Sequence, residues 1–130
     1  FASKESKMSF IQSVKRCFIN CTNFSGRASR ADYWFFYLFD IIAFNVFSVI
    51  HASYGSGGVG LLLINSLFIL LAIITGITYL AVGVRRLHDV DRSGWWLLVA
   101  FTVIGIILLF YWQIKASDKE ANRFGERPLS

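Results

Sequence analysis

Two long stretches without charged side chains dominate the pattern of this chain. Between Asp40 and Arg85 lie 44 residues without an Asp, Glu, Lys or Arg, and between Arg92 and Lys115 lie another 22. An α-helix needs about 20 apolar residues to cross the roughly 30 Å hydrocarbon core of a bilayer. The shorter stretch fits one crossing, and the longer fits two because a glycine- and serine-rich turn at 51–60 divides it. The pattern predicts three transmembrane helices, at about 33–50, 61–84 and 95–114.

A shorter amphipathic segment precedes the apolar stretches. Its apolar residues recur with the spacing of one face of an α-helix: Phe10, Ile11, Val14, Cys17, Phe18 and Cys21. Basic residues flank this face, so residues 9–23 are expected to form a helix lying in the headgroup region of the membrane. The alternative is that its apolar face packs against the spanning helices. Residues 1–8 are expected to be disordered or to have been added to the natural chain.

Composition supports a membrane protein. Hydrophobic residues make up 55% of the 130 residues and charged residues 16%, against about 25% charged in ordinary soluble domains. The charged residues also lie in separate groups, divided by the long uncharged stretches. This composition and pattern argue against a nucleic-acid-binding module, a disordered chain and a disulfide scaffold. The expected fold is an all-α membrane protein, with three transmembrane helices in residues 24–114 after the interfacial helix and a polar tail at 115–130.

The basic residues predict an orientation. Six Lys and Arg residues precede the first predicted span, three lie between the second and third, four lie in the tail, and the glycine-rich turn has none. The positive-inside rule then places the N-terminus in the cytoplasm of a multi-pass protein. Three spans would put the tail on the outer side. A third helix that dips into the membrane and returns would bring the tail inside, and the sequence leaves its side open.

The first polar motif, residues 25–34, fits the start of a membrane helix. Ser29 and Asp32 have the spacing of a capping box, and Arg27 and Arg30 are expected to face anionic headgroups. Aromatic residues at helix ends are typical of the membrane interface. Four are expected to anchor the helices there: Tyr33, Trp34, Trp95 and Trp96.

The second polar motif connects the second and third predicted spans. Seven of the nine residues from 85 to 93 are polar, and we expect them to bond one another as a structural cluster. A ligand or partner site is the alternative. An acid–base pair of His88 and Asp89 is disfavoured, because adjacent helical residues do not face each other.

Asp40 is the one charged residue inside a predicted span, where an ionisable group usually has a partner. We expect it to pair with Arg85 or Arg86, or else to reach the headgroups. The predicted polar cluster comprises Asp40, Arg85, Arg86, His88, Asp89 and Arg92.

Three motifs, SGRASRADYW at 25–34, RRLHDVDRSGWW at 85–96 and NRFGERP at 122–128, occur in the order of a known family. In them the chain resembles the YhaH/YhaI-like family of small bacterial inner-membrane proteins, which is defined by a domain of unknown function (805). The resemblance covers about residues 10–128. It implies a helical protein of the bacterial inner (cytoplasmic) membrane and no assigned chemistry.

No catalytic, cofactor-binding or metal-binding residue is predicted, because the sequence carries no metal-ligand set, nucleophile motif or phosphate loop. We therefore expect a non-enzymatic interaction, structural or regulatory component of the membrane with a basic cytoplasmic hairpin. Its expected partners are anionic lipid headgroups and a second copy or another membrane protein, not nucleic acid. The alternative is a subunit of an oligomeric channel or transporter, since three helices do not easily enclose a pathway.

Overall fold

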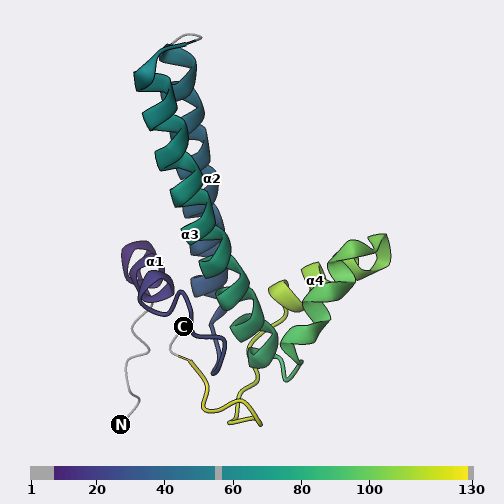
Figure 1. Ribbon diagram of the computed structural model, residues 1–130. Helices are drawn as coiled ribbons and strands as arrows, with labels where there is room; N and C mark the ends of the chain where they lie inside the picture. The colour runs from purple at the N-terminus through teal and green to yellow at the C-terminus, as the bar shows by residue number, and fades with distance from the viewer. Residues whose placement is uncertain (1–7, 55–56, 129–130) are drawn as a thin grey trace.

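Two long antiparallel helices form the main body of the protein in the computed structural model, which describes residues 8–54 and 57–128 (Figure 1). They are α2, Arg30–Ser53, and α3, Val59–Asp89. Both are long and apolar enough to cross a membrane, and most of their apolar side chains are exposed on the molecule. Such a surface needs lipid or a partner around it. These two helices confirm the helical character predicted for the first two spans, and both extend beyond the predicted bounds.

Aromatic side chains fix the register of α2 against α3. The rings of Phe47 and Phe68 stack with 3.8 Å between their centroids, and the hydroxyl groups of Tyr33 and Tyr79 lie 2.6 Å apart. Phe36 is fully buried close to the start of α2. Aromatic contacts therefore join the two helices both toward the turn between them and toward the end where α2 begins and α3 ends.

The short helix α1, Phe10–Ile19, begins at a capping box formed by Ser9 and Gln12. Cys17 belongs to the same buried core as Phe36, and the ring of Phe18 contacts that of Phe36 edge to face at 5.4 Å. The predicted amphipathic helix is therefore present, and part of its apolar face packs on α2. Its position at the membrane interface stays a prediction. Residues 1–7 of the segment expected to be disordered lie outside the described residues.

The structure corrects the prediction of one continuous helix over 95–114. The chain instead forms a 3₁₀ helix, η1, Gly94–Phe101, and a separate α-helix, α4, Val103–Ile114, which runs back beside it (Figure 1). Thr102 between them is extended, and its hydroxyl accepts a hydrogen bond from the amide of Gly105 at 3.0 Å. A side chain at Gly105 would lie 1.8 Å from the carbonyl oxygen of Val99, so only glycine permits this close turn. We call η1 and α4 together the short hairpin.

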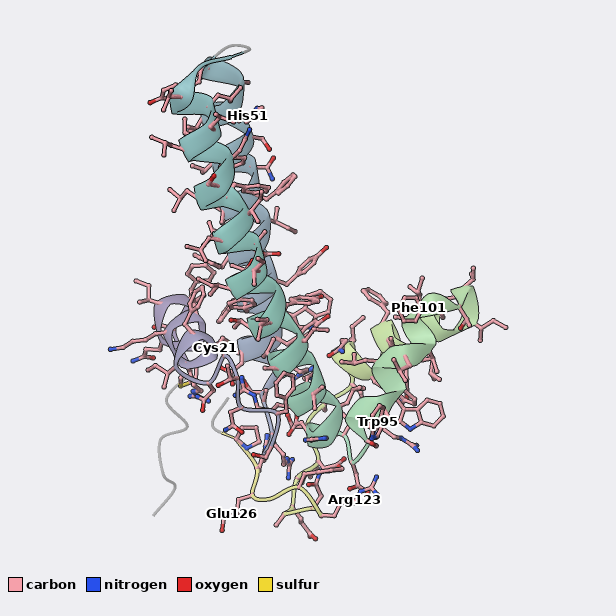
Figure 2. The ribbon with its side chains drawn as sticks, viewed as in Figure 1. Cys21, His51, Trp95, Phe101, Arg123 and Glu126 are labelled. Atoms are coloured by element: carbon pink, nitrogen blue, oxygen red, sulfur yellow. The ribbon has the colours of Figure 1, made fainter. Side chains whose placement is uncertain are left out.

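The short hairpin also determines where the tail lies. Because it reverses direction, residues from Lys115 onward return to the end of the molecule where α2 begins and α3 ends (Figure 1). The amide of Asp118 donates to the carbonyl of Asp89 at 3.3 Å, and Asn122 and Gly125 close a tight turn by two backbone hydrogen bonds. Figure 2 shows Arg123 and Glu126 at this end and His51 at the opposite end. Of the two positions that the sequence leaves open for the tail, the structure therefore has the one at the same end of the molecule as the start of α2.

Candidate functional site

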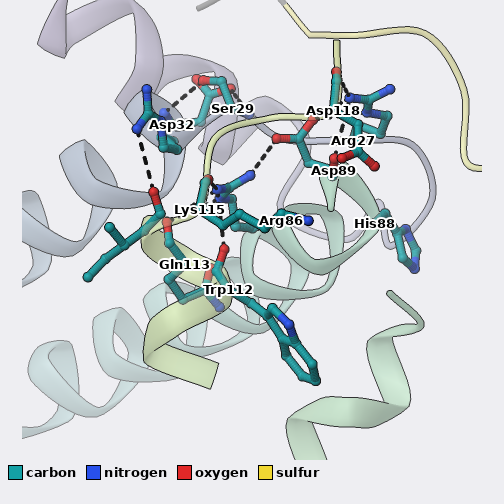
Figure 3. Close-up of polar contacts among 12 residues, drawn as sticks. Arg27, Ser29, Asp32, Arg86, His88, Asp89, Trp112, Gln113, Lys115 and Asp118 are labelled. Carbon is teal, nitrogen blue, oxygen red and sulfur yellow. Dashed lines mark hydrogen bonds and ion pairs between the residues drawn. The ribbon is translucent and has the colours of Figure 1, made fainter. Parts of the chain in front are cut away.

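One carboxylate joins two buried arginines where α2, α3 and the tail meet (Figure 3). Asp89, the last residue of α3, accepts from Nε of Arg27 at 2.9 Å through one oxygen and pairs with Nη1 of Arg86 through the other. At most 1% of each of these three side chains is exposed. Arg86 lies one helical turn before Asp89, and Arg27 comes from the loop before α2. We call Arg27, Arg86 and Asp89 the ion cluster.

Arg86 joins the ion cluster to the short hairpin. Its guanidinium donates to the carbonyl groups of Trp112 and Gln113, each at 3.3 Å, and to that of Lys115. These carbonyls lie at the C-terminal end of α4, where the last groups of a helix have no partner within the helix and carry partial negative charge. Arg86 thus caps α4 and holds it against α3.

Arg27 joins the ion cluster to the tail. Its guanidinium donates to the carbonyl groups of Asp118 at 2.9 Å, Glu120 at 2.8 Å and Gly125 at 3.3 Å. The carboxylate of Asp89 holds this guanidinium in position. The tail is therefore fixed by a charged group that is itself fixed inside the protein.

His88 lies beside the ion cluster but does not pair with Asp89. Its Nδ1 lies 3.0 Å from the carbonyl oxygen of Gly26, and its ring stacks on Phe124 with 3.9 Å between centroids. Its own carbonyl accepts from the side-chain amide of Asn122 at 2.9 Å. Both oxygens of Asp89 are occupied by arginines, so the two neighbours do not form an acid–base pair. Sequence reasoning missed the role of the tail, for which the only signal was the third motif.

The first motif starts α2 as predicted. The amide of Asp32 donates to the hydroxyl of Ser29 at 3.1 Å, and the amide of Ser29 donates to Asp32 at 3.2 Å. Asp32 also pairs with Arg16 of α1 at 3.2 Å. Burial raises the pKa of the neighbouring Cys17 thiol to about 12, and the negative charge of Asp32 adds to the effect. The capping box is therefore confirmed, and the carboxylate in it also holds α1.

The remaining basic residues of the two motifs lie outside the ion cluster. Arg30 is exposed and lies 3.5 Å from the carbonyl of Ile114, while Arg92 lies over the ring of Trp112. Arg85 donates to the carbonyl of Ala81 within α3. Among the expected anchors, Tyr33 is buried against Tyr79, Trp34 donates to the carbonyl of Gln113, and Trp95 and Trp96 are exposed. The predicted contact of Arg27 with headgroups is wrong, because its side chain is buried against Asp89 and the tail. For Arg30 and the exposed tryptophans, contact with headgroups or the membrane interface stays a prediction.

The structure does not bear out the predicted pairing of Asp40. Asp40 forms no ion pair or side-chain hydrogen bond within the described ranges 8–54 and 57–128, and Arg86 pairs with Asp89 instead. The reason is depth: Asp40 lies ten residues into α2, about 15 Å along its axis, and shares a cavity with Tyr79 of α3. Arg85 is six residues closer than Tyr79 to the C-terminal end of α3, about 9 Å along the helix axis. Its guanidinium donates to a carbonyl group of α3 instead.

Asp40 lines a groove between α2 and α3 with a volume of about 420 Å³. We call this the Asp40 groove. Small side chains or none line part of it, at Ala43, Ala72 and Gly76, and Thr75 and Tyr79 add hydroxyl groups. No set of three His, Cys, Asp or Glu residues that could hold a metal ion occurs in the described part of the chain.

Comparison with known proteins agrees with the motif pattern. Residues 21–126 match the family described as "Protein of unknown function (DUF805)". The chain is 36% identical over 113 residues to inner membrane protein YhaH of Escherichia coli strain K12, covering 84% of this chain and 89% of that protein. It is 36% identical over 110 residues to inner membrane protein YhaI of the same strain, covering 84% and 88%. No solved structure gives a significant match.

Proposed function

Because this chain belongs to the DUF805 family of proteins of unknown function, we propose a role from its geometry: a non-enzymatic interaction component of the bacterial inner membrane. In this role α2 and α3 cross the bilayer, and the Asp40 groove binds a transmembrane helix of another protein. The ion cluster serves to hold the short hairpin and the tail, since its charged groups are paired with one another and with carbonyls.

The distribution of charge supports an orientation with the N-terminus in the cytoplasm. Eleven of the 13 Lys and Arg residues fall in the described ranges, all but Lys4 and Lys7, and they lie at the end where α2 begins and α3 ends (Figure 1). The opposite end, including the turn between α2 and α3, has none. The positive-inside rule assigns the basic end to the cytoplasm. The short hairpin then enters the membrane from the cytoplasmic side, and α4, about 18 Å long, is too short to cross.

The observation that carries the proposal is the carboxylate of Asp40 without a partner. At about 15 Å from the start of α2 it lies near the middle of a roughly 30 Å core. A charged aspartate there costs about 2.5–3.5 kcal/mol on insertion scales, and such groups usually pair. A Lys or Arg on a neighbouring helix would remove most of that cost. The partner helix is therefore expected to carry a basic residue at the depth of Asp40.

The small residues of the Asp40 groove allow such a helix to approach. A Cβ atom added at Gly76 would meet nothing within 4 Å, so this face is not used in the packing of α2 on α3. Together with Ala72 it forms the small-xxx-small spacing that favours close helix contacts in membranes. A second copy of this chain is the poorer partner, because its nearest exposed cation on α2, Arg30, lies about 15 Å from the level of Asp40.

A photo-crosslinking experiment in bacterial membranes tests the proposal. A photoreactive amino acid replaces Ala72 in the groove, or Ile69 as a control that is 60% exposed and outside it. We expect a protein adduct from position 72 only, with a mass other than twice that of the chain, and its loss in Asp40→Asn. An adduct that persists unchanged in Asp40→Asn, or equal adducts from both positions, contradicts the proposal.

The same carboxylate supports a second candidate function, a subunit of an oligomeric channel or transporter with Asp40 along its pathway. Here position 72 would crosslink to a second copy, and the purified protein would be a ring. Cation flux into liposomes that falls in Asp40→Asn would favour this candidate. A monomer without flux would favour the interaction role.

A further inference from the structure

A second cavity separates the short hairpin from the long helices. The hairpin diverges from α2 and α3 (Figure 1), and the space between them has a volume of about 490 Å³. We call it the wedge. Its walls are mainly apolar: Leu80 of α3, Leu97 and Phe101 of η1, and Ile106 and Phe110 of α4 line it. Ligand pockets commonly measure about 300–1,000 Å³.

The shape of the wedge fits an acyl chain better than a helix. At its narrow end Trp34 donates to the carbonyl of Gln113 at 3.3 Å, and Arg86 binds the end of α4, which closes the base. Figure 2 shows Trp95 near the base of the hairpin and Phe101 toward its far end. An α-helix with side chains is about 10–12 Å wide and would not reach that base. The 12 residues of α4 span about 18 Å, close to the roughly 15 Å thickness of one leaflet.

One polar group in the wall lacks a partner. Gln113 is 4% exposed and lines the wedge, and its side-chain oxygen has no hydrogen-bond partner among the described residues. The hydroxyl groups of Tyr33 and Tyr79 line the same space, and their mutual bond at 2.6 Å uses only one of their two protons. Buried polar groups are normally hydrogen-bonded. The wall therefore offers hydrogen bonds to the polar part of an amphiphile.

Two exposed cations lie beside the base of the wedge. Arg30 lies 3.5 Å from the carbonyl of Ile114, and Lys115 follows in the chain. The adjoining residues Trp34 and Gln113 line the wedge itself. Cations beside an apolar cavity are the chemistry that recognises a negative headgroup attached to a hydrocarbon chain.

We infer that the wedge binds one anionic phospholipid, with an acyl chain between the short hairpin and α2–α3 and its phosphate at Arg30 and Lys115. A headgroup hydroxyl would bond the Gln113 amide and the tyrosine pair. This site is separate from the Asp40 groove, and it does not depend on the function proposed for that groove.

Native mass spectrometry of the purified full-length chain tests the inference. Phosphatidylglycerol, phosphatidylethanolamine and phosphatidylcholine with identical acyl chains are titrated into the delipidated protein in detergent. We expect one phosphatidylglycerol to bind before the other two. Arg30→Gln should weaken its binding about fivefold, the effect of one basic residue near an anionic surface, and Arg127→Gln should leave it unchanged.

A pair of bulky substitutions locates the site. Ala100→Trp fills the wedge and should abolish the bound lipid, whereas Ile107→Trp, at a position 67% exposed on the hairpin and outside the wedge, should not. Gln113→Met removes the side-chain amide and should weaken the binding of phosphatidylglycerol. It leaves the hydrogen bonds to the backbone carbonyl of residue 113 in place. Melting curves of each variant show whether it folds, and Arg30→Gln at the surface keeps the test valid if Ala100→Trp does not.

Three results would overturn the inference. Equal binding of phosphatidylcholine and phosphatidylglycerol would show an unspecific lipid shell. Equal losses from Ala100→Trp and Ile107→Trp would show a general disturbance of the hairpin. A lipid-free dimer that Ala100→Trp dissociates would show that a second copy fills the wedge.

Discussion

Replacing Asp89 by Asn should loosen the whole polar end of the protein. The change keeps the shape of the side chain but leaves the guanidinium groups of Arg27 and Arg86 buried without a counterion. Removing one partner of a buried ion pair costs about 3–5 kcal/mol. Since Arg86 caps α4 and Arg27 holds the tail, we expect both to detach before α2 and α3 unfold.

Two measurements follow this loss. The free energy of unfolding comes from denaturant titration in detergent, and limited proteolysis at Lys119 reports the release of the tail. Asp91→Asn is the matched control, because Asp91 and Arg123 form an exposed pair that contributes at most about 1 kcal/mol. If Asp89→Asn costs no more than Asp91→Asn, or if tail cleavage is unchanged, the ion cluster does not hold this end together.

Three further predictions test separate features. Gly105→Ala should open the short hairpin, since the added atom would lie 1.8 Å from a carbonyl oxygen, whereas Gly76→Ala should be tolerated; helix content by circular dichroism and melting temperature compare them. With a pKa of about 12 and 1% exposure, Cys17 should stay unlabelled by a maleimide at pH 8 while Cys21 reacts, and equal labelling would contradict its burial. Gln113→Met should raise the melting temperature in lipid-free detergent, because it removes a buried amide oxygen without a partner; a lower value would show that this oxygen is satisfied in solution.

Local signals in the sequence predicted the parts of the fold that depend on neighbouring residues. The apolar stretches gave α2 and α3, and the spacing of Ser29 and Asp32 gave the capping box that begins α2. The short hairpin was harder because all of 95–114 is apolar enough for a span. Its break depends on the extended backbone at Thr102 and on a close contact that only Gly105 permits. Hydrophobic periodicity carries no information about such a turn.

The pairing within the ion cluster could not be predicted from the sequence either. Arg27 and Asp89 are 62 residues apart, and nothing in their spacing selects them over other pairs of opposite charge. The sequence favoured Arg85 or Arg86 as the partner of Asp40, because an ionisable group inside a predicted span usually has a partner and these arginines follow the neighbouring span. The antiparallel register instead places Asp40 in the groove lined by Thr75 and Tyr79, more than two helical turns from Asp89. Whether Arg86 can reach Asp40 or Asp89 depends on how far α2 and α3 are displaced along each other, and the sequence does not contain that displacement.

The turn between α2 and α3 has a consequence for how the protein reaches its place. From residue 41 to residue 84 the chain contains no Asp, Glu, Lys or Arg, and the tip of the two long helices lies in the middle of this stretch. In the proposed orientation the pair can therefore be threaded across the bilayer without carrying a formal charge to its far side, and only the carboxylate of Asp40 enters the hydrocarbon core. In that orientation the arginines stay on the side of the ribosome, where Arg86 then holds the short hairpin and Arg27 holds the tail.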